Sequence, residues 1–417
     1  MLGIKKNIKE IKYWLQVFLL PLYWISFLTP RKKDIWLFGS TFGNRFADNP
    51  KYLYLYLNQG FHDNNETKIR PIWISRNKQI VSLLKRHKLE VYYKFSFKAI
   101  LFCLIGKVYI FDNYSKDISF WLSGGAIKVN LWHGIPLKKI NHDNKFDYAR
   151  NPRNKKEKFI FALRTLSDEK PEHYVLTTSD YMKSIFESAF ITKNIIVSGY
   201  PRNDCFHMKY ENIMTDFEYK INQELAYYRS VNYGDNKKKN KVVLYMPTFR
   251  DSETKFFDVI NFDELHNFLL NNNVLFCFKL HPKSKLSERL NRTIYNKYSN
   301  FSIISNQTDP YSFLNEVDIL ITDYSSIYFD FLLTNRPIIF FDYDREEYLK
   351  SSRELYFEYD KFTPGEKVEN MIELMNALLK DDNYQKQREN IRKLIMDKSN
   401  NENSKQLFHD LMKTLYR

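Results

Sequence analysis

Short apolar runs alternate with helix-like segments along most of the chain. The runs predict strands at 34–39, 69–75, 107–112, 127–132, 173–178 and 195–198, and again at 242–245, 274–280, 301–304, 318–322 and 337–341. Between them, apolar residues recur every three or four positions, as on one face of a helix. Strands that alternate with helices are typical of parallel sheets covered by helices, so the pattern predicts an α/β fold.

A polar stretch divides this rhythm in two. Residues 211–240 carry few apolar positions and end in the lysine cluster 237–239, so we interpret them as a linker. This predicts two Rossmann-like domains, at 34–210 and 241–383, followed by a polar helical tail at 384–417. Ligands of open α/β sheets bind at the carboxyl ends of the strands, so two such domains predict a central cleft that both face.

The first 33 residues have a different character. Four lysines and the basic cluster 31–33 flank an uncharged run at 13–30 that is rich in Trp, Tyr and Phe. A membrane-spanning helix needs ~20 apolar residues, and Pro21 interrupts this run. Aromatic residues between cations are typical of segments that lie among lipid headgroups. We therefore expect residues 1–33 to associate with a membrane, with a true span or a helix packed on the protein itself as alternatives.

Composition and charge narrow the classes of function. The chain has 417 residues, 44% of them hydrophobic, and a net charge of +15. These values indicate a folded protein with an anionic partner, either a membrane surface or a phosphate-rich substrate. Nucleic acid is disfavoured as a partner, because the aromatic residues lie inside apolar runs. Walker A, G-x-G-x-x-G, zinc-ligand and nucleophile-elbow patterns are absent from the sequence, which disfavours NTPases, dehydrogenases and hydrolases.

Two histidines follow predicted strands. His133 comes after the run at 127–132, and His281 after the run at 274–280, with Lys279 and Lys283 beside it. Histidine suits general base catalysis because its pKa lies near neutrality. We expect the two histidines to occupy equivalent positions in the two domains and to face one cleft. Taken singly, each one also fits a structural role at a strand end.

A third cluster of polar groups follows the strand at 318–322. Ser325 and Ser326 precede a helix-like run at 327–335, and Asp330 lies one turn further on. Hydroxyl groups and free N–H groups at a helix N-terminus attract anions, although an ordinary serine cap gives the same pattern. The Asp-Tyr-Asp sequence at 342–344 formally matches a metal motif, but we interpret it as a turn.

Together, these blocks resemble one known family. The ordered set is NLWHGIPLKKI at 130–140, GYPRND at 199–204, VLYMPTFRD at 243–251, KLHP at 279–282 and DILITDYSSIYFDFLLTNRPIIFFDYDREEY at 318–348. In order and spacing, it is similar to the CDP-glycerol glycerophosphotransferases, the teichoic-acid primases and polymerases. The last block is the most specific of the five.

This resemblance implies a GT-B-type fold, a CDP-polyol donor bound by the C-terminal domain, and peripheral attachment to the cytoplasmic face of the membrane. His133 and His281 match the family's catalytic histidines. The positions that match donor contacts are Gly134, Ile135, Pro136, Leu137, Arg202, Thr248, Lys279, Ser325, Ser326 and Asp330. We expect neither a cofactor nor a tightly held metal. Small departures occur at Ile135, where the family often has threonine, at Phe249, where it often has tryptophan, and at 141–143.

The expected reaction is transfer of glycerol phosphate, or a related polyol phosphate, from CDP-glycerol or CDP-ribitol to a lipid-linked or polymeric acceptor. CMP would be released, and the product would be a teichoic-acid or capsule-type surface polymer. We expect His133 to act as the base and His281 to contact the donor. A GT-B glycosyltransferase that uses a nucleotide sugar remains the alternative. The choices between glycerol and ribitol and between primase and polymerase stay open.

Overall fold

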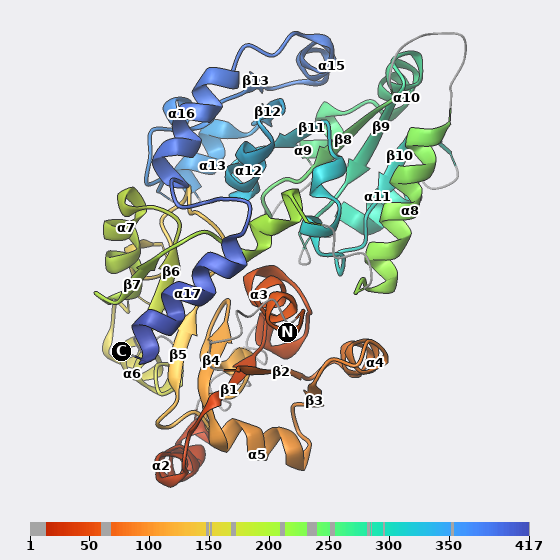
Figure 1. Ribbon diagram of the computed structural model, residues 1–417. Helices are drawn as coiled ribbons and strands as arrows, with labels where there is room; N and C mark the ends of the chain where they lie inside the picture. Colours follow the sequence, from red (N-terminus) through yellow and green to blue (C-terminus); the bar gives the residue numbers. More distant parts are fainter. Residues whose placement is uncertain are drawn as a thin grey trace. The chain divides into compact units, whose positions relative to one another are not determined.

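Two parallel sheets organise the chain, one in each of two units (Figure 1). The computed structural model describes residues 14–59, 68–146, 150, 152–167, 172–208, 213–231, 240–250, 255–281, 284, 286–294, 297–351 and 354–416. The N-terminal unit contains the chain up to His133, Ile140–His207, and the residues from Ile395 on. The C-terminal unit contains Gly134–Lys139 and Met208–Leu394. The predicted α/β fold with two parallel sheets is confirmed.

The sheet of the N-terminal unit has the strand order β3-β2-β1-β4-β5-β6-β7. Its strands are β1 (Lys32–Phe38), β2 (Arg70–Ser75), β3 (Val91–Tyr93), β4 (Gly106–Phe111), β5 (Ile127–Asn130), β6 (Tyr174–Thr177) and β7 (Ile195–Val197). Apolar side chains of β1, β2 and β4 form a buried cluster with helix α5 (Phe97–Ile105), which covers one face of the sheet. The central strands are buried on both faces, as parallel strands between helical layers usually are.

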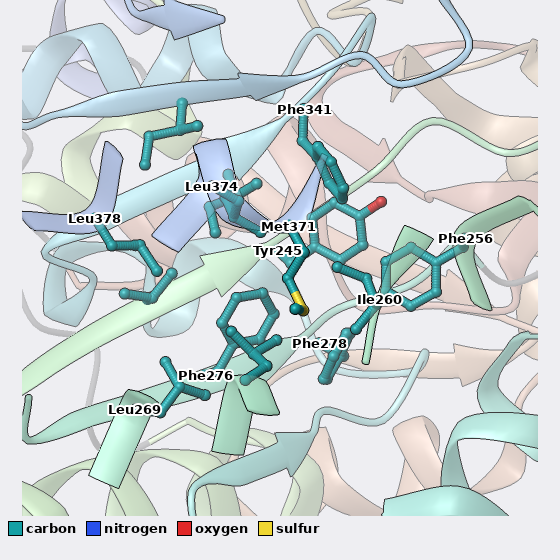
Figure 2. Close-up of a cluster of buried hydrophobic side chains, with 14 of the residues drawn as sticks. Tyr245, Phe256, Ile260, Leu269, Phe276, Phe278, Phe341, Met371, Leu374 and Leu378 are labelled. Carbon is teal, nitrogen blue, oxygen red and sulfur yellow. The ribbon is translucent and has the colours of Figure 1, made fainter. Parts of the chain in front are cut away.

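The sheet of the C-terminal unit has the strand order β10-β9-β8-β11-β12-β13. Its strands are β8 (Lys241–Tyr245), β9 (Val274–Phe278), β10 (Phe301–Ile303), β11 (Ile319–Thr322), β12 (Ile338–Phe341) and β13 (Glu366–Val368). Figure 2 shows the core on one face of this sheet, where aromatic rings gather around Tyr245. The ring of Tyr245 stacks on Phe256 with 5.4 Å between centroids. This packing fixes the last residue of β8, from which a candidate binding loop departs.

Helices connect the strands in both units. In the N-terminal unit they are α2 (Leu20–Ile25), α3 (Asp48–Asn58), α4 (Lys78–Arg86), α5 (Phe97–Ile105), α6 (Lys155–Arg164), α7 (Asp180–Phe190) and α17 (Asn403–Tyr416). The C-terminal unit has α8 (Asp216–Ser230), α9 (Lys255–Val259), α10 (Phe262–Asn271), α11 (Leu286–Ile294), α12 (Ile327–Phe331), α13 (Arg345–Ser351), α14 (Tyr359–Phe362), α15 (Met371–Leu379) and α16 (Gln385–Ile395). Asn and Ser side chains cap the starts of α4, α5, α7, α10 and α15, which satisfies their free N–H groups.

The polar stretches predicted as linker and tail each contain a helix that belongs to one of the two units. Helix α8 lies within the predicted linker 211–240, whose residues 211–212 and 232–239 fall outside the described part of the chain. Within the predicted tail 384–417, α17 belongs to the N-terminal unit. The buried carboxylate of Asp204 accepts hydrogen bonds from the backbone N–H groups of Asn403 (2.7 Å) and Ser404 (3.0 Å) at the start of α17. An acidic group at this end of a helix also matches the helix dipole.

The aromatic segment near the N-terminus packs on the N-terminal unit. The hydroxyl of Ser26 accepts a hydrogen bond from the Gly124 N–H at 2.8 Å, and Tyr23 stacks on Phe120 with 4.6 Å between ring centroids. Arg31 donates to the Cys103 carbonyl at 2.7 Å. In the described part of the chain, every helix is too short or too polar to cross a membrane. Residues 1–13 of the predicted membrane-associating segment lie outside the described residues.

Candidate functional site

The loop after β5 carries the first predicted histidine. We expected the strand to reach Trp132, but β5 ends at Asn130, because Trp132 adopts a left-handed backbone conformation with a φ of 52°. The side chain of Asn49 holds this turn by donating to the carbonyl oxygens of Leu131 (3.1 Å) and Trp132 (2.9 Å). His133 therefore lies on a braced loop past the strand end, with its ring centroid 4.0 Å from that of Trp132.

The imidazole of His133 is exposed and oriented by one backbone contact. Its Nδ1 lies 3.0 Å from the carbonyl oxygen of Asp112, which follows β4. A carbonyl oxygen can only accept a hydrogen bond, so Nδ1 carries the hydrogen and donates it. In the neutral ring, the lone pair is then on Nε2. The arrangement presents a proton acceptor at the carboxyl edge of the sheet, as a general base requires.

Two buried carboxyl groups support this contact. Asp112 accepts hydrogen bonds from the Ser40 hydroxyl and from the Thr41 N–H (3.2 Å), while Asp117 accepts from the backbone N–H groups of Phe42 (2.6 Å) and Asn113 (3.0 Å). Burial raises the pKa of Asp112, and the charge of Asp48 raises it further. Burial and repulsion from Asp112 raise the pKa of Asp117 well above its ordinary value. Neither carboxyl group was predicted as part of the site.

Arg202 lies under the same loop. Its side chain is 1% exposed, and its Nη1 is 2.9 Å from a carboxylate oxygen of Asp48. Its backbone N–H donates to the side-chain oxygen of Asn49 at 3.2 Å, and Asn49 holds the turn before His133. These contacts fit a residue that positions the histidine loop. The predicted contact of Arg202 with the donor stays a prediction.

The four residues after His133 belong to the C-terminal unit. Gly134 has a φ of 146°, which favours glycine, and the side chains of Ile135 and Leu137 are buried. The carbonyl of Leu137 accepts from the Tyr356 N–H at 2.9 Å, and the Lys139 N–H donates to the Glu354 carbonyl at 2.8 Å. The predicted donor-contacting run from Gly134 through Pro136 to Leu137 is thus anchored to the unit that is expected to bind the donor.

A pocket with an empty volume of about 280 Å³ lies at the carboxyl ends of β8 and β9. Its lining includes Thr248, Phe249 and Arg250 after β8, and Leu280, His281 and Ser284 after β9. Because β8 and β9 are neighbours, their loops meet at one edge of the sheet. The exposed ring of His281 lies 5.5 Å from that of Phe249, centroid to centroid. Thr248 and His281, both predicted site residues, therefore come together.

Arg250 is the electrostatic centre of this pocket. Its side chain is 8% exposed, and it donates to Asp323 at 2.6 Å and to Asp344 at 2.9 Å. Burial disfavours the charge of Arg250, but the two carboxylates outweigh burial and raise its pKa. Asp323 also accepts a hydrogen bond from the Thr248 N–H at 2.8 Å. Arg250 belongs to the VLYMPTFRD block but is not among the predicted site residues, and its partner Asp344 is the second Asp of the turn at 342–344.

The remaining predicted residues of the C-terminal unit are not among those that line this pocket. Lys279 is buried, with its Nζ 3.4 Å from the Asn306 carbonyl oxygen, and buried Asp330 accepts from the Tyr311 hydroxyl at 3.0 Å. Ser325 and Ser326 are half-buried before α12. This helix has only five residues, so it provides less of a helix dipole than the predicted run at 327–335 implied. Lys283 lies outside the described residues.

The two histidines do not occupy equivalent positions, which corrects our expectation. Both sheets share the order third, second, first and fourth strand, so β8 corresponds to β1 and β9 to β2. His281 follows β9, whereas His133 follows β5, on the other side of the first strand of its sheet. The similar sequence around the two residues therefore does not reflect a repeated site.

Comparisons with known proteins agree with this organisation. The chain is 31% identical to the teichoic acid poly(glycerol phosphate) polymerase of Bacillus spizizenii over 373 residues, which is 87% of each chain. It is 31% identical to the teichoic acid glycerol-phosphate transferase of Staphylococcus aureus over 358 residues, or 83% of each chain. A solved structure of the wall teichoic acid polymerase TagF shares its fold, with a TM-score of 0.70 and 24% identity over 99% of this chain and 98% of that one.

The family profile described as CDP-Glycerol:Poly(glycerophosphate) glycerophosphotransferase matches residues 22–413. This match covers both sheets, both histidine loops and helix α12. The resemblance seen in the sequence is therefore confirmed, as is the prediction that the protein is a transferase. The chain belongs to the CDP-glycerol:poly(glycerophosphate) glycerophosphotransferase family.

Proposed function

We propose that this protein transfers glycerol phosphate, or a related polyol phosphate, from CDP-glycerol to a hydroxyl group of a lipid-linked or polymeric teichoic-acid acceptor. The observation that carries the proposal is the 3.0 Å contact between His133 Nδ1 and the Asp112 carbonyl oxygen. That contact leaves Nε2 as a base for the acceptor hydroxyl, in a chain whose family uses a CDP-activated donor.

In this reaction, the acceptor oxygen attacks the phosphorus that carries glycerol, and His133 takes the hydroxyl proton. A new oxygen–phosphorus bond forms as the bond to the CMP phosphate breaks, and CMP leaves with the charge. The pocket beside His281 and Thr248 would hold the donor, with His281, Ser325 and Ser326 donating hydrogen bonds to the leaving phosphate. Lys279 would add positive charge near the diphosphate, and we expect no tightly held metal to be needed.

A donor panel tests this proposal. CMP release from CDP-glycerol and CDP-ribitol, and UMP or UDP release from UDP-sugars, would be measured with a lipid-linked glycerol-phosphate acceptor, with and without chelator. The proposal predicts acceptor-dependent release from a CDP-polyol alone, unaffected by the chelator. Turnover of UDP-sugars instead would favour the alternative of a nucleotide-sugar glycosyltransferase. Activity that is lost in chelator and restored by a divalent cation would contradict the metal-free assignment.

We further propose that the protein binds the cytoplasmic face of the membrane peripherally. Large apolar side chains are exposed along the aromatic segment, including Phe18 (79%), Trp24 (66%) and Leu28 (84%). Helix α5 adds Phe97, which is 81% exposed, and Arg31 ties the segment to the end of this helix. Exposed aromatic and aliphatic side chains beside the basic cluster 31–33 fit an anionic lipid surface.

Vesicle binding tests this second proposal. The double substitution Phe18→Glu and Leu28→Glu should abolish co-sedimentation with phosphatidylglycerol vesicles, because it places charge on the face that would enter the lipid. Leu379→Glu is the matched control, since Leu379 is 54% exposed on α15 in the other unit. Undiminished vesicle binding of the double variant would contradict the proposed face.

A further inference from the structure

A second pocket lies beside the histidine loop of the N-terminal unit, and no role has been given to it above. It has an empty volume of about 330 Å³ and lies between the loops after β4 and β5 and the end of helix α7. Its lining residues are Tyr114, Asn130, Asn141, His142, Arg150, Glu172, Ala189 and Phe190. Part of this space is open to solvent, so a ligand could enter the pocket from the surface.

Direct contacts connect this pocket to the candidate base. Phe190 packs edge-on against Trp132, with 4.8 Å between ring centroids, and Trp132 lies against His133. The side chain of Asn130 accepts a hydrogen bond from the Trp132 N–H at 2.8 Å. Tyr114 lies two residues after Asp112, whose carbonyl orients the imidazole. A ligand in the pocket would therefore be held by the same side chains that shape the histidine loop.

The lining combines several kinds of polar group with one apolar wall. The guanidinium of Arg150 donates to the Tyr114 hydroxyl at 2.7 Å, so it is fixed at the pocket wall. A guanidinium recognises phosphate oxygens, and the side chains of Asn130, Asn141 and Glu172 suit hydroxyl groups. The ring of Phe190 offers an apolar surface for a carbon chain. This combination matches a polyol phosphate.

We propose that this pocket binds the terminal polyol-phosphate unit of the acceptor, and that Arg150 recognises its phosphate. The inference rests on the proposed function, because it assumes that His133 deprotonates the acceptor. A general base must lie within hydrogen-bond reach of the hydroxyl that it activates. The acceptor end must therefore bind on the unit that carries His133, and this pocket adjoins that residue's loop.

Steady-state kinetics of Arg150→Gln tests the proposal. The acceptor KM should rise about tenfold or more, because a charge-assisted hydrogen bond to phosphate is lost, while the KM for CDP-glycerol stays within about twofold. Arg150→Lys keeps the charge and should recover part of the loss. Glu172→Gln should also raise the acceptor KM, without acting on the phosphate. Arg153→Gln is the matched control, since Arg153 is exposed and outside the pocket lining.

Measuring the same variants with acceptors that end in a polyol phosphate or in a neutral sugar separates the possible outcomes. With an acceptor that ends in a neutral sugar, Arg150→Gln should have no effect, and an equal loss there would overturn the phosphate assignment. Unchanged acceptor KM values in folded Arg150→Gln and Glu172→Gln would overturn the pocket assignment while transfer itself stands. If Arg150→Gln unfolds by circular dichroism, Glu172→Gln decides alone. A wild-type protein that releases CMP with no acceptor in the series would instead refute the proposed function.

Discussion

Asp112 and Asp323 occupy the same place in the two sheets. Each comes directly after the fourth strand of its sheet in chain order, which pairs with the first strand: β4 with β1, and β11 with β8. Each also accepts a backbone N–H from the loop after that first strand: Thr41 donates to Asp112 at 3.2 Å, and Thr248 donates to Asp323 at 2.8 Å. In each unit, one carboxyl group thus holds the loop that follows the first strand, at the carboxyl edge of the sheet.

The electrostatic surroundings of the two residues differ. Asp323 shares the buried Arg250 with Asp344, so one cation lies between the two carboxylates. Asp112 lies beside a second buried carboxyl, Asp117, and burial raises the pKa of both. This difference corresponds to the different roles that we propose for the two units. The C-terminal unit keeps a fixed ion pair at the pocket expected to bind an anionic donor, whereas the N-terminal unit supports a proton acceptor with groups that tend to hold their own protons.

The largest effect should come from removing the proton acceptor. His133→Ala should lower turnover roughly 100- to 10,000-fold, the usual contribution of a general base, while CDP-glycerol affinity stays near the wild-type value. CMP release and calorimetric donor titration measure the two quantities. His87→Ala, at an exposed histidine that ends helix α4, is the control. Near-normal turnover of His133→Ala would refute the base assignment.

The next effect concerns the ion pair. Arg250→Gln leaves Asp323 and Asp344 without their cation, and breaking a buried pair in this way costs about 3–5 kcal/mol. Urea unfolding of the variant should show a loss of this size. Arg345→Gln is the control, because Arg345 pairs with Asp360 at the surface, where a pair contributes less than about 1 kcal/mol. Equal losses in the two variants would mean that burial does not distinguish these arginines.

A smaller effect is expected at the second histidine. His281→Ala should weaken CDP-glycerol binding about 10- to 100-fold, since hydrogen bonds to charged groups are worth about 1.5–3 kcal/mol. Turnover should fall as well, because the same contact would stabilise the leaving phosphate. The His87→Ala control applies to the same titration. If donor affinity is unchanged, His281 does not contact the diphosphate. The assignment of donor binding to the C-terminal unit and proton transfer to the N-terminal unit would then lose its support.

The smallest effect is a change in pH dependence. The pKa of Asp117 is raised in the fold, so the folded protein binds that proton more tightly than the unfolded chain does. Its contribution to stability is fully present below the ordinary Asp pKa and is lost as pH rises through the raised value. Thermal unfolding of wild type and Asp117→Asn across pH 4–8 isolates this contribution as a difference between the curves. Parallel curves would contradict it.

The sequence predicted the strands well and the site in part. A strand overlaps each of the eleven predicted apolar runs. Strands β3 and β13 were not predicted, because each is a three-residue edge strand that lies outside those runs. His133 and His281 stood out because each follows a predicted strand and is followed by a proline within three residues. Arg250 and its partner Asp323 are 73 residues apart, so only the order of strands in the sheet brings them together. The two histidines looked equivalent for the same reason, because the sequence does not reveal the strand order that separates their positions.

Helix α17, near the C-terminus, belongs to the N-terminal unit, and this has a consequence for folding during synthesis. Synthesis runs from the N-terminus, so β1 to β7 leave the ribosome well before the helix that Asp204 caps. All of Met208–Leu394 is produced in the interval. The unit that is translated first is thus completed last, and the C-terminal unit has its full set of strands before the N-terminal unit gains helix α17.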